Sequence, residues 1–196
     1  MRLIQSKLEW LVNPDGSLGH EIRLWEREGK YPSLAKIPSK HKVLILDTEE
    51  RKFSDLPEVG RTWLFEQCTK MAEVEFFLLT DTPIQFIGKI LPKNLWLGFL
   101  MHRQKDVPRL TLLTRQEVKT FVVIDPMEEG INMRYGVIKW IIIGAANPSS
   151  LTKPQAENFI DDVKRYNVAL YVRPSIAFRD DYPKDVPGVG RLERHR

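Results

Sequence analysis

Polar side chains that could do chemistry follow the apolar segments of this sequence. Six of these residues are predicted to line one ligand-binding site: Asp47, Asp81, His102, Asp125, Asn147 and Arg173. Carboxylate, imidazole, amide and guanidinium groups can together bind charged or hydrogen-bonding ligands. No catalytic role is assigned to any of them. A strand end that simply meets solvent is the ordinary alternative for each residue, so the prediction depends on the whole set.

These residues can share a site only if the apolar runs are neighbouring parallel strands. The runs cover residues 43–46, 76–79, 95–100, 121–124, 138–143 and 168–172. They are rich in β-branched and aromatic residues and do not alternate with polar ones, which is typical of strands buried on both faces of a parallel sheet. Ligands of such folds bind at the carboxyl ends of the strands.

Helical patterns lie between the apolar runs. Residues 155–166 carry an apolar stripe of Ala156, Phe159, Ile160 and Val163, and Thr152 with Gln155 predicts a capping box before it. Further helices are expected over residues 59–72, with Val59, Trp63, Leu64, Cys68 and Met71 on one side, over 106–117, briefly after Thr82-Pro83, and near 20–28. The order predicts an α/β fold with a six-stranded parallel sheet, open or curled into a partial barrel.

The chain is expected to form one domain. Its 196 residues suffice for a sizeable core, with a loop-rich lead-in (1–40), a half-barrel (41–175) and a tail (176–196). The net charge of +4 permits a polyanionic partner without requiring one. Cys68 is the single cysteine, which excludes an internal disulfide and a multi-cysteine metal site. No secretion signal or membrane-spanning run is recognised, so a cytoplasmic location with no membrane partner is expected.

A magnesium site is another possibility for the strand-end residues. Asp47, Asp81 and Asp125 could bind Mg²⁺ for a hydrolase or nuclease, if they converge. The histidines His20, His41, His102 and His195 are scattered in the sequence without metal-ligand spacing.

A basic surface is a further possibility. Arg103, Lys105 and Arg109 follow the third apolar run, and Arg173 and Arg179 follow the last one. They could face a phosphate or a nucleic acid, although a solvated charged face is the commoner explanation of such a run. Trp10 and Trp25 in the lead-in are the tryptophans expected to cover the sheet or contact a ligand.

Seven segments in order resemble the phage and bacterial family known as the gp-thirty-seven/gp-sixty-eight phage proteins. They are Lys7-Leu8-Glu9-Trp10 with Asn13-Pro14-Asp15-Gly16, Lys42 to Asp47, Phe77 to Pro83, Leu91 to Gly98, Asp125-Pro126, Ile138 to Gly144, and Val168 to Arg173. The family is related to radical S-adenosylmethionine enzymes. The resemblance implies a (β/α)6 partial TIM-like barrel of the radical-SAM type and, for a phage-encoded protein, a place in the host cytoplasm.

The departures from the family pattern decide the expected activity. The family has a cysteine after the N-P-x-x-G motif and others in a C-Y-A segment, whereas Ser17 follows Gly16 here and residues 18–33 contain no cysteine. An iron–sulfur cluster needs several thiolates, so we expect no cluster and no radical-SAM enzyme activity. The leading hypothesis is a pseudoenzyme that binds a small ligand, a nucleic acid or a protein partner. A virion or complex component remains the other alternative, to be recognised by a large exposed apolar patch in the lead-in or tail.

Overall fold

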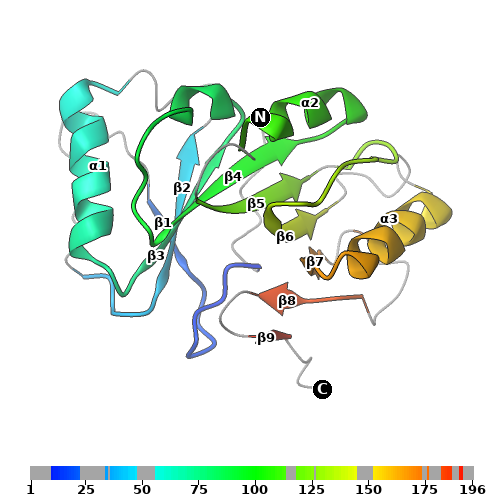
Figure 1. The fold of residues 1–196 in the computed structure, drawn as a ribbon. Helices are drawn as coiled ribbons and strands as arrows, with labels where there is room; N and C mark the ends of the chain where they lie inside the picture. Colours follow the sequence, from blue (N-terminus) through cyan, green and yellow to red (C-terminus); the bar gives the residue numbers. More distant parts are fainter. Residues whose placement is uncertain are drawn as a thin grey trace.

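The computed structural model describes residues 10–22, 34, 36–47, 56–113, 118–125, 127–144, 152–173, 176, 182–186 and 190–191. They form an α/β fold around a seven-stranded parallel sheet (Figure 1). The elements are β1 (His20–Ile22), β2 (Lys42–Asp47), α1 (Glu58–Lys70), β3 (Glu75–Thr80), the 3-10 helix η3 (Pro83–Phe86), β4 (Leu95–Met101), the 3-10 helix η4 (Gln104–Asp106), α2 (Val107–Leu113), β5 (Lys119–Ile124), β6 (Ile138–Ile143), α3 (Lys153–Arg165), β7 (Ala169–Val172), β8 (Asp185–Val186) and β9 (Gly190–Arg191).

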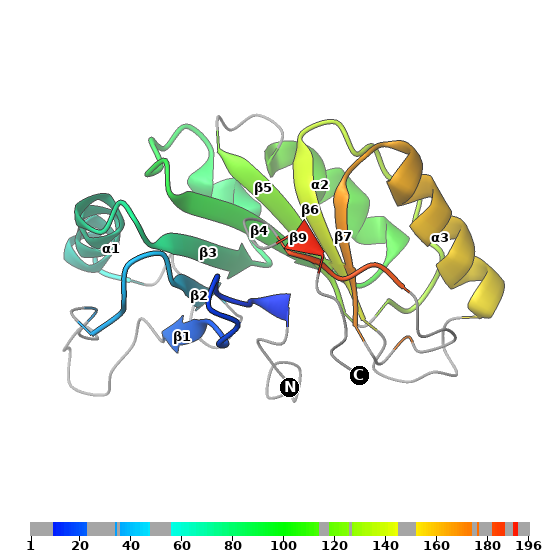
Figure 2. The ribbon, with the colours of Figure 1, turned by 90° about the horizontal axis from the view of Figure 1, so that it is seen from below.

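The strands lie in the sheet in chain order, from β1 to β7. With right-handed crossovers, this order places every connecting helix on the same face of the sheet. Leu64 of α1, Leu110 of α2 and Phe159 of α3 accordingly belong to one apolar cluster with one face of the strands. Figures 1 and 2 show α1 beside the first strands and α3 beside the last. The helices therefore cover one face and leave the other to different segments.

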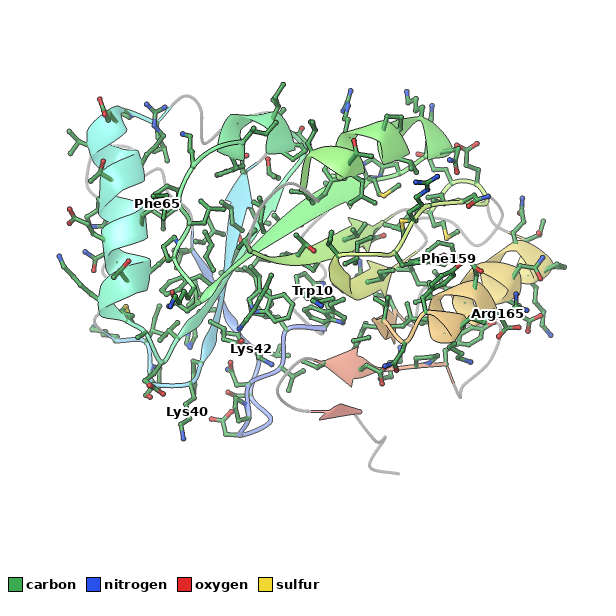
Figure 3. All side chains as sticks on the ribbon, in the orientation of Figure 1. Trp10, Lys40, Lys42, Phe65, Phe159 and Arg165 are labelled. Carbon is green, nitrogen blue, oxygen red and sulfur yellow. The ribbon has the colours of Figure 1, made fainter. Side chains whose placement is uncertain are left out.

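The face without helices is rich in aromatic side chains, and we call Phe77, Trp96, Phe121 and Trp140 the aromatic face. Phe77 and Trp96 stack with ring centroids 5.4 Å apart, and Phe77 meets the ring of Phe121 edge-on at 5.6 Å. Trp10 covers this surface, with its ring 5.5 Å from that of Trp140 (Figure 3). The prediction that Trp10 covers the sheet is confirmed, whereas Trp25 lies outside the described residues.

The tail also crosses the aromatic face. The indole N–H of Trp140 donates to the carbonyl of Asp185 at 2.9 Å, and Val186 joins the same apolar cluster. The backbone N–H of Leu170 in β7 donates to the carboxylate of Asp185 at 3.2 Å. Lead-in and tail thus supply the cover that helices supply on the other face.

The predicted strands are confirmed as β2 to β7, but a seventh strand was missed. Residues 20–22 form β1, parallel to β2, with His20 opposite Val43 and Ile22 opposite Ile45. The short helix expected near 20–28 is wrong at these three residues, and residues 23–28 are not described. A three-residue strand is too short to show a period of its own, and pairing with β2 decides its conformation.

The helix predictions hold in α3 and need correction elsewhere. Thr152 and Gln155 form the predicted capping box, and the apolar stripe of α3 is buried. In α1, Leu64 and Cys68 are buried, but Val59 is 71% exposed and does not belong to the buried side. The helix expected over 106–117 is α2 preceded by η4, and the one after Thr82-Pro83 is the single 3-10 turn η3. No helix in the described part of the chain has the length and apolarity to cross a membrane.

Candidate functional site

The carboxyl ends of the strands carry the predicted site residues. Asp47 is the last residue of β2, and Asp81, His102, Asp125 and Arg173 follow the ends of β3, β4, β5 and β7. Because all seven strands are parallel, these residues lie along one edge of the sheet, which we call the rim. Asn147 lies outside the described residues.

A buried ion pair closes one part of the rim. The guanidinium of Arg173 donates to the carboxylate of Asp125, and both side chains are 11% exposed. They come from β5 and β7, so the pair spans the end of the intervening strand β6. Gly144 occupies that end, and a Cβ atom there would lie 2.7 Å from the carboxylate carbon of Asp125 and 3.0 Å from Cδ of Arg173. The absence of a side chain at Gly144 therefore makes room for the ion pair.

Asp47 belongs to a second polar group of the rim. The Thr80 hydroxyl and the Gln85 side-chain amide both donate to Oδ2 of the Asp47 carboxylate. Thr80 ends β3 opposite Asp47 in the register, and Gln85 reaches back from η3. The same Gln85 amide lies 3.2 Å from the hydroxyl of Thr82. Asp47 is 2% exposed, so its carboxylate depends on these donors in place of water.

Three polar atoms beside this group are shielded from solvent without a hydrogen-bond partner among the described residues. They are Oδ1 of Asp81, Oε1 of Gln85 and Nδ1 of His102. Buried polar atoms are nearly always paired, so each unpaired one needs a reason. Two of the three are oxygen acceptors, and the imidazole nitrogen can donate or accept. This part of the rim is therefore suited to a ligand that carries hydrogen-bond donors.

The three carboxylates considered for Mg²⁺ do not gather. Asp47 bonds to Thr80 and Gln85, whereas Asp125 bonds to Arg173. Within the ranges that the structure describes, no group of three or more His, Cys, Asp or Glu side chains is placed to hold a metal ion. The convergence that a magnesium-dependent hydrolase would require is absent there.

Acidic groups accompany two of the basic residues that were expected to form a basic surface. The guanidinium of Arg103 bonds to the carboxylate of Glu128. Burial raises the pKa of the Asp106 carboxyl, but the backbone N–H groups of His102 and Arg103 donate to it, and its pKa lies below the ordinary value. Arg173 is paired with Asp125, and Arg179 lies outside the described residues. Lys105 and Arg109 are exposed, and the possibility of a nucleic-acid contact now depends on these two residues.

The donor set does not fit an iron–sulfur cluster. Cys68 is fully buried in α1, on the face that the helices cover, and burial raises the pKa of its thiol to about 12. Thiolate ligands must be deprotonated and within reach of the metal. Ser17 stands where the family pattern has a cysteine, and its hydroxyl donates to Asp15 at 2.6 Å.

The opposite edge of the sheet holds a polar cluster that the sequence did not indicate. Nε2 of His20 and Nδ1 of His41 are 3.0 Å apart, and Nε2 of His41 is 3.4 Å from Asp15. The two histidines stand at the beginnings of β1 and β2, so parallel pairing brings together residues separated by 21 positions. The two histidines are scattered in the sequence, as described above, and the missed strand β1 brings them together in space.

Two open grooves lie away from the rim. One, of about 430 Å³, lies between α1 and residues 90–92, and the other, of about 500 Å³, lies between α2 and residues 132–134. Neither is lined by a predicted site residue.

Comparison with protein-family models, with curated proteins and with solved structures finds no match to this chain. Its function must therefore be inferred from the geometry of the site.

Proposed function

We propose that this protein is a cluster-less relative of the gp-thirty-seven/gp-sixty-eight phage proteins that binds a small ligand at the rim. Its fold would be a partial barrel of the radical-SAM type, and it would act as a binding or accessory module. The observation that carries the proposal is the set of shielded, unpartnered atoms at the ends of β3 and β4, on Asp81, Gln85 and His102.

The strand order supports a barrel-like fold. A sheet with neighbours in chain order and helices on one face has the layout of part of a (β/α) barrel, since a doubly wound sheet reverses its order and has helices on both faces. Trp10 and Val186 occupy the side that would be the barrel interior. The rim is then the part of such a fold where a polar ligand can bind.

The chemistry of the rim favours a ligand with hydrogen-bond donors. Asp81 and Gln85 offer oxygen acceptors, and Asp125 is neutralised by Arg173. The negative charge of Asp81 further favours an amine or another cationic group over a phosphate. The family that the chain resembles has Lys-Arg at the positions of Asp81-Thr82. The charge at this place is therefore positive in the family and negative in this chain, which fits a change of ligand.

Thermal unfolding against a ligand panel tests the proposal. The panel contains amines and polyols, nucleotides, S-adenosylmethionine, and short DNA and RNA. A ligand of the folded state at 100 times its Kd adds about 2.7 kcal/mol, which is several degrees for a chain of this length. We expect a donor-rich compound to raise Tm, and the rise to be lost in Asp81→Asn.

A matched surface variant completes the experiment. Asp161→Asn makes the same change at an exposed position of α3 and should keep the full ligand response. If no donor-rich compound stabilises the protein, or if both variants respond as the wild type does, the rim is not the ligand site. Iron and sulfide in anaerobically purified protein would contradict the cluster-less assignment.

A structural role in an assembly is the second candidate. Ile84, Ile87 and Ile90 between β3 and β4 are 65%, 40% and 96% exposed. These isoleucines lie on the connection between β3 and β4, whereas a patch was expected in the lead-in or tail, most of which lies outside the described residues. Exposed isoleucines so close in sequence are typical of contact surfaces. Sedimentation of the wild type beside an Ile90→Ser variant tests this role, because a self-association that Ile90 drives should weaken in the variant.

A further inference from the structure

In the described part of the chain, the segment that precedes β1 is hydrogen-bonded to two consecutive residues at the amino end of β2. We call residues 10–18 the strap, because they run across the aromatic face and the amino ends of the strands (Figure 3). Within the described part of the chain, its hydrogen bonds and ion pair to the sheet end on His41 and Lys42. The Lys42 ammonium donates to the carbonyl of Val12 at 2.7 Å, and the backbone N–H of Lys42 donates to Oδ1 of Asn13 at 2.8 Å.

The neighbours of His41 indicate which of its ring nitrogens carries the hydrogen. Since Oδ1 of Asn13 accepts from Lys42, the amide nitrogen of Asn13 faces Nδ1 of His41, at 3.3 Å. The two hydrogens of this amide already point to the Ser17 hydroxyl and the Leu18 carbonyl, each at 2.9 Å, so Asn13 does not decide the tautomer of His41. A carboxylate can only accept, so the partner of Nε2 assigns the His41 proton to that nitrogen. Nε2 is the atom that faces the carboxylate of Asp15, at 3.4 Å, and Asp15 is in turn held by Ser17.

His20 faces the lone pair on Nδ1 of His41. Its Nε2 lies 3.0 Å from Nδ1 of His41, the ring planes differ by 27°, and the centroids are 5.3 Å apart. The rings therefore lie nearly end to end, and the lone pair of one nitrogen points at the N–H of the other. A shared metal ion would need both lone pairs to converge beside this line, so the contact is an N–H···N hydrogen bond.

We propose that His20 and His41 form an acid-sensitive latch that holds the strap over the aromatic face and releases Trp10 when both imidazoles are protonated. A single added proton can be shared by the two facing nitrogens, and Asp15 stabilises that charge. A second proton leaves neither nitrogen with a lone pair and places two cations 3.0 Å apart. The amide of Asn13 then also faces an N–H group. The released strap binds more protons than the closed one, so closure weakens as the pH falls.

The charged groups around the latch support this direction. Asp15 lies on the turn of the strap, and Lys42, from β2, adds positive charge beside the histidines. Glu75, from β3, donates its backbone N–H to the carbonyl of His41 at 3.1 Å, while its carboxylate is engaged by Lys119 at 3.5 Å and by the indole of Trp96 at 3.2 Å. The carboxylate of Asp15 is the one that contacts His41, and it is 59% exposed, so its attraction is screened by solvent. The repulsion between two protonated imidazoles is therefore only partly offset.

Quenching of tryptophan fluorescence by iodide tests the latch in the full chain. From about pH 8 to about pH 5, which spans the ordinary histidine range, we expect accessibility to iodide to rise several-fold in the wild type and not in Trp10→Phe. We expect no rise in His41→Gln, because the glutamine carbonyl accepts from His20 at any pH while its amide donates to Asp15. His102→Gln removes an imidazole at the opposite edge of the sheet and should keep the wild-type response.

Imidazole nitrogen NMR of the wild type keeps the test decisive if His41→Gln does not fold. We expect an unprotonated Nδ1 on His41 at about pH 8, and the rise in quenching to coincide with protonation of both rings. Shielding of Trp10 with both rings protonated would overturn the proposal. So would a loss of helical circular dichroism along with the quenching change, because acid would then unfold the whole protein. The ligand-binding role of the rim is unaffected by either result.

Discussion

Replacement of Gly144 by alanine tests the packing of the rim most directly. The added Cβ would lie 2.7 Å from Cγ and from Oδ1 of Asp125, and 3.0 Å from Cδ of Arg173. The two contacts with the carboxylate are closer than real Cβ atoms approach, so Asp125 must move and its bond to Arg173 must loosen. Overpacking of this kind costs about 1–3 kcal/mol. Complete removal of one partner of a buried ion pair destabilises a protein by about 3–5 kcal/mol, and this value is the upper bound for the destabilisation by Gly144→Ala.

The assay is urea unfolding at neutral pH, with thermal unfolding as a second measurement. At about 2–4 °C per kcal/mol for a chain of this length, Gly144→Ala should lower Tm by about 2–12 °C. Gly136→Ala is the matched control, because no atom lies within 4 Å of a Cβ there and its φ is not positive. The reasoning fails if the two alanine variants are equally stable.

A double-mutant cycle identifies the partner that causes the cost. If the clash with the Asp125 carboxylate is the cause, Gly144→Ala should destabilise an Asp125→Ala background much less than it destabilises the wild type. The flexible end of Arg173 can move away from a Cβ at 3.0 Å. An equal cost in both backgrounds would assign the strain to the backbone of Gly144 and would refute the role given to the ion pair.

Three further predictions concern the sheet, a helix and the strap. Gly98→Ala should destabilise the fold more than Gly144→Ala in urea unfolding, because its Cβ would lie 2.2–2.6 Å from ring carbons of Phe121 inside the aromatic face. Thr152→Ala removes the hydroxyl that accepts from the backbone of Gln155 and should cost about 1 kcal/mol in the same assay, whereas Thr152→Ser should cost little. Burial lowers the pKa of Lys42 from 10.5 to about 8, so the folded state binds fewer protons than the unfolded state between these pH values. The free energy of unfolding should therefore rise with pH across this range, by up to about 3 kcal/mol relative to the Lys42→Met variant. Parallel pH profiles of stability for the two proteins would contradict this prediction.

Strand positions could be predicted because the sheet is buried on both faces. Runs such as 76–79 and 121–124 are apolar on every residue, so their length and composition alone distinguish them. The strand ends followed from these runs, which is why Asp125 and Arg173 were expected at one edge. The ion pair between them did not follow, since it requires adjacent places for β5, β6 and β7 and a residue without a side chain at Gly144.

The contacts that sequence analysis missed depend on pairing between distant segments. Gln85 belongs to the rim because the connection after β3 turns back in η3, and no spacing rule relates it to Asp47. His20 and His41 meet because β1 pairs with β2, and three residues carry too little pattern to predict that strand. Both clusters consist of ordinary polar residues, whose types alone do not distinguish a site from a solvated loop.

The two edges of the sheet differ in a way that assigns them different roles. At the rim, Asp81, Gln85 and His102 keep shielded atoms without partners in the described structure, so a ligand with donors has something to gain there. At the amino edge, Asn13 and His41 have their polar atoms engaged within the strap and the sheet, so an added ligand would have to break bonds already made. A cluster already satisfied by its own neighbours responds to protons, which change its donors and acceptors, more readily than to a ligand. The rim is therefore the place to look for binding, and the amino edge is the place to look for a response to pH.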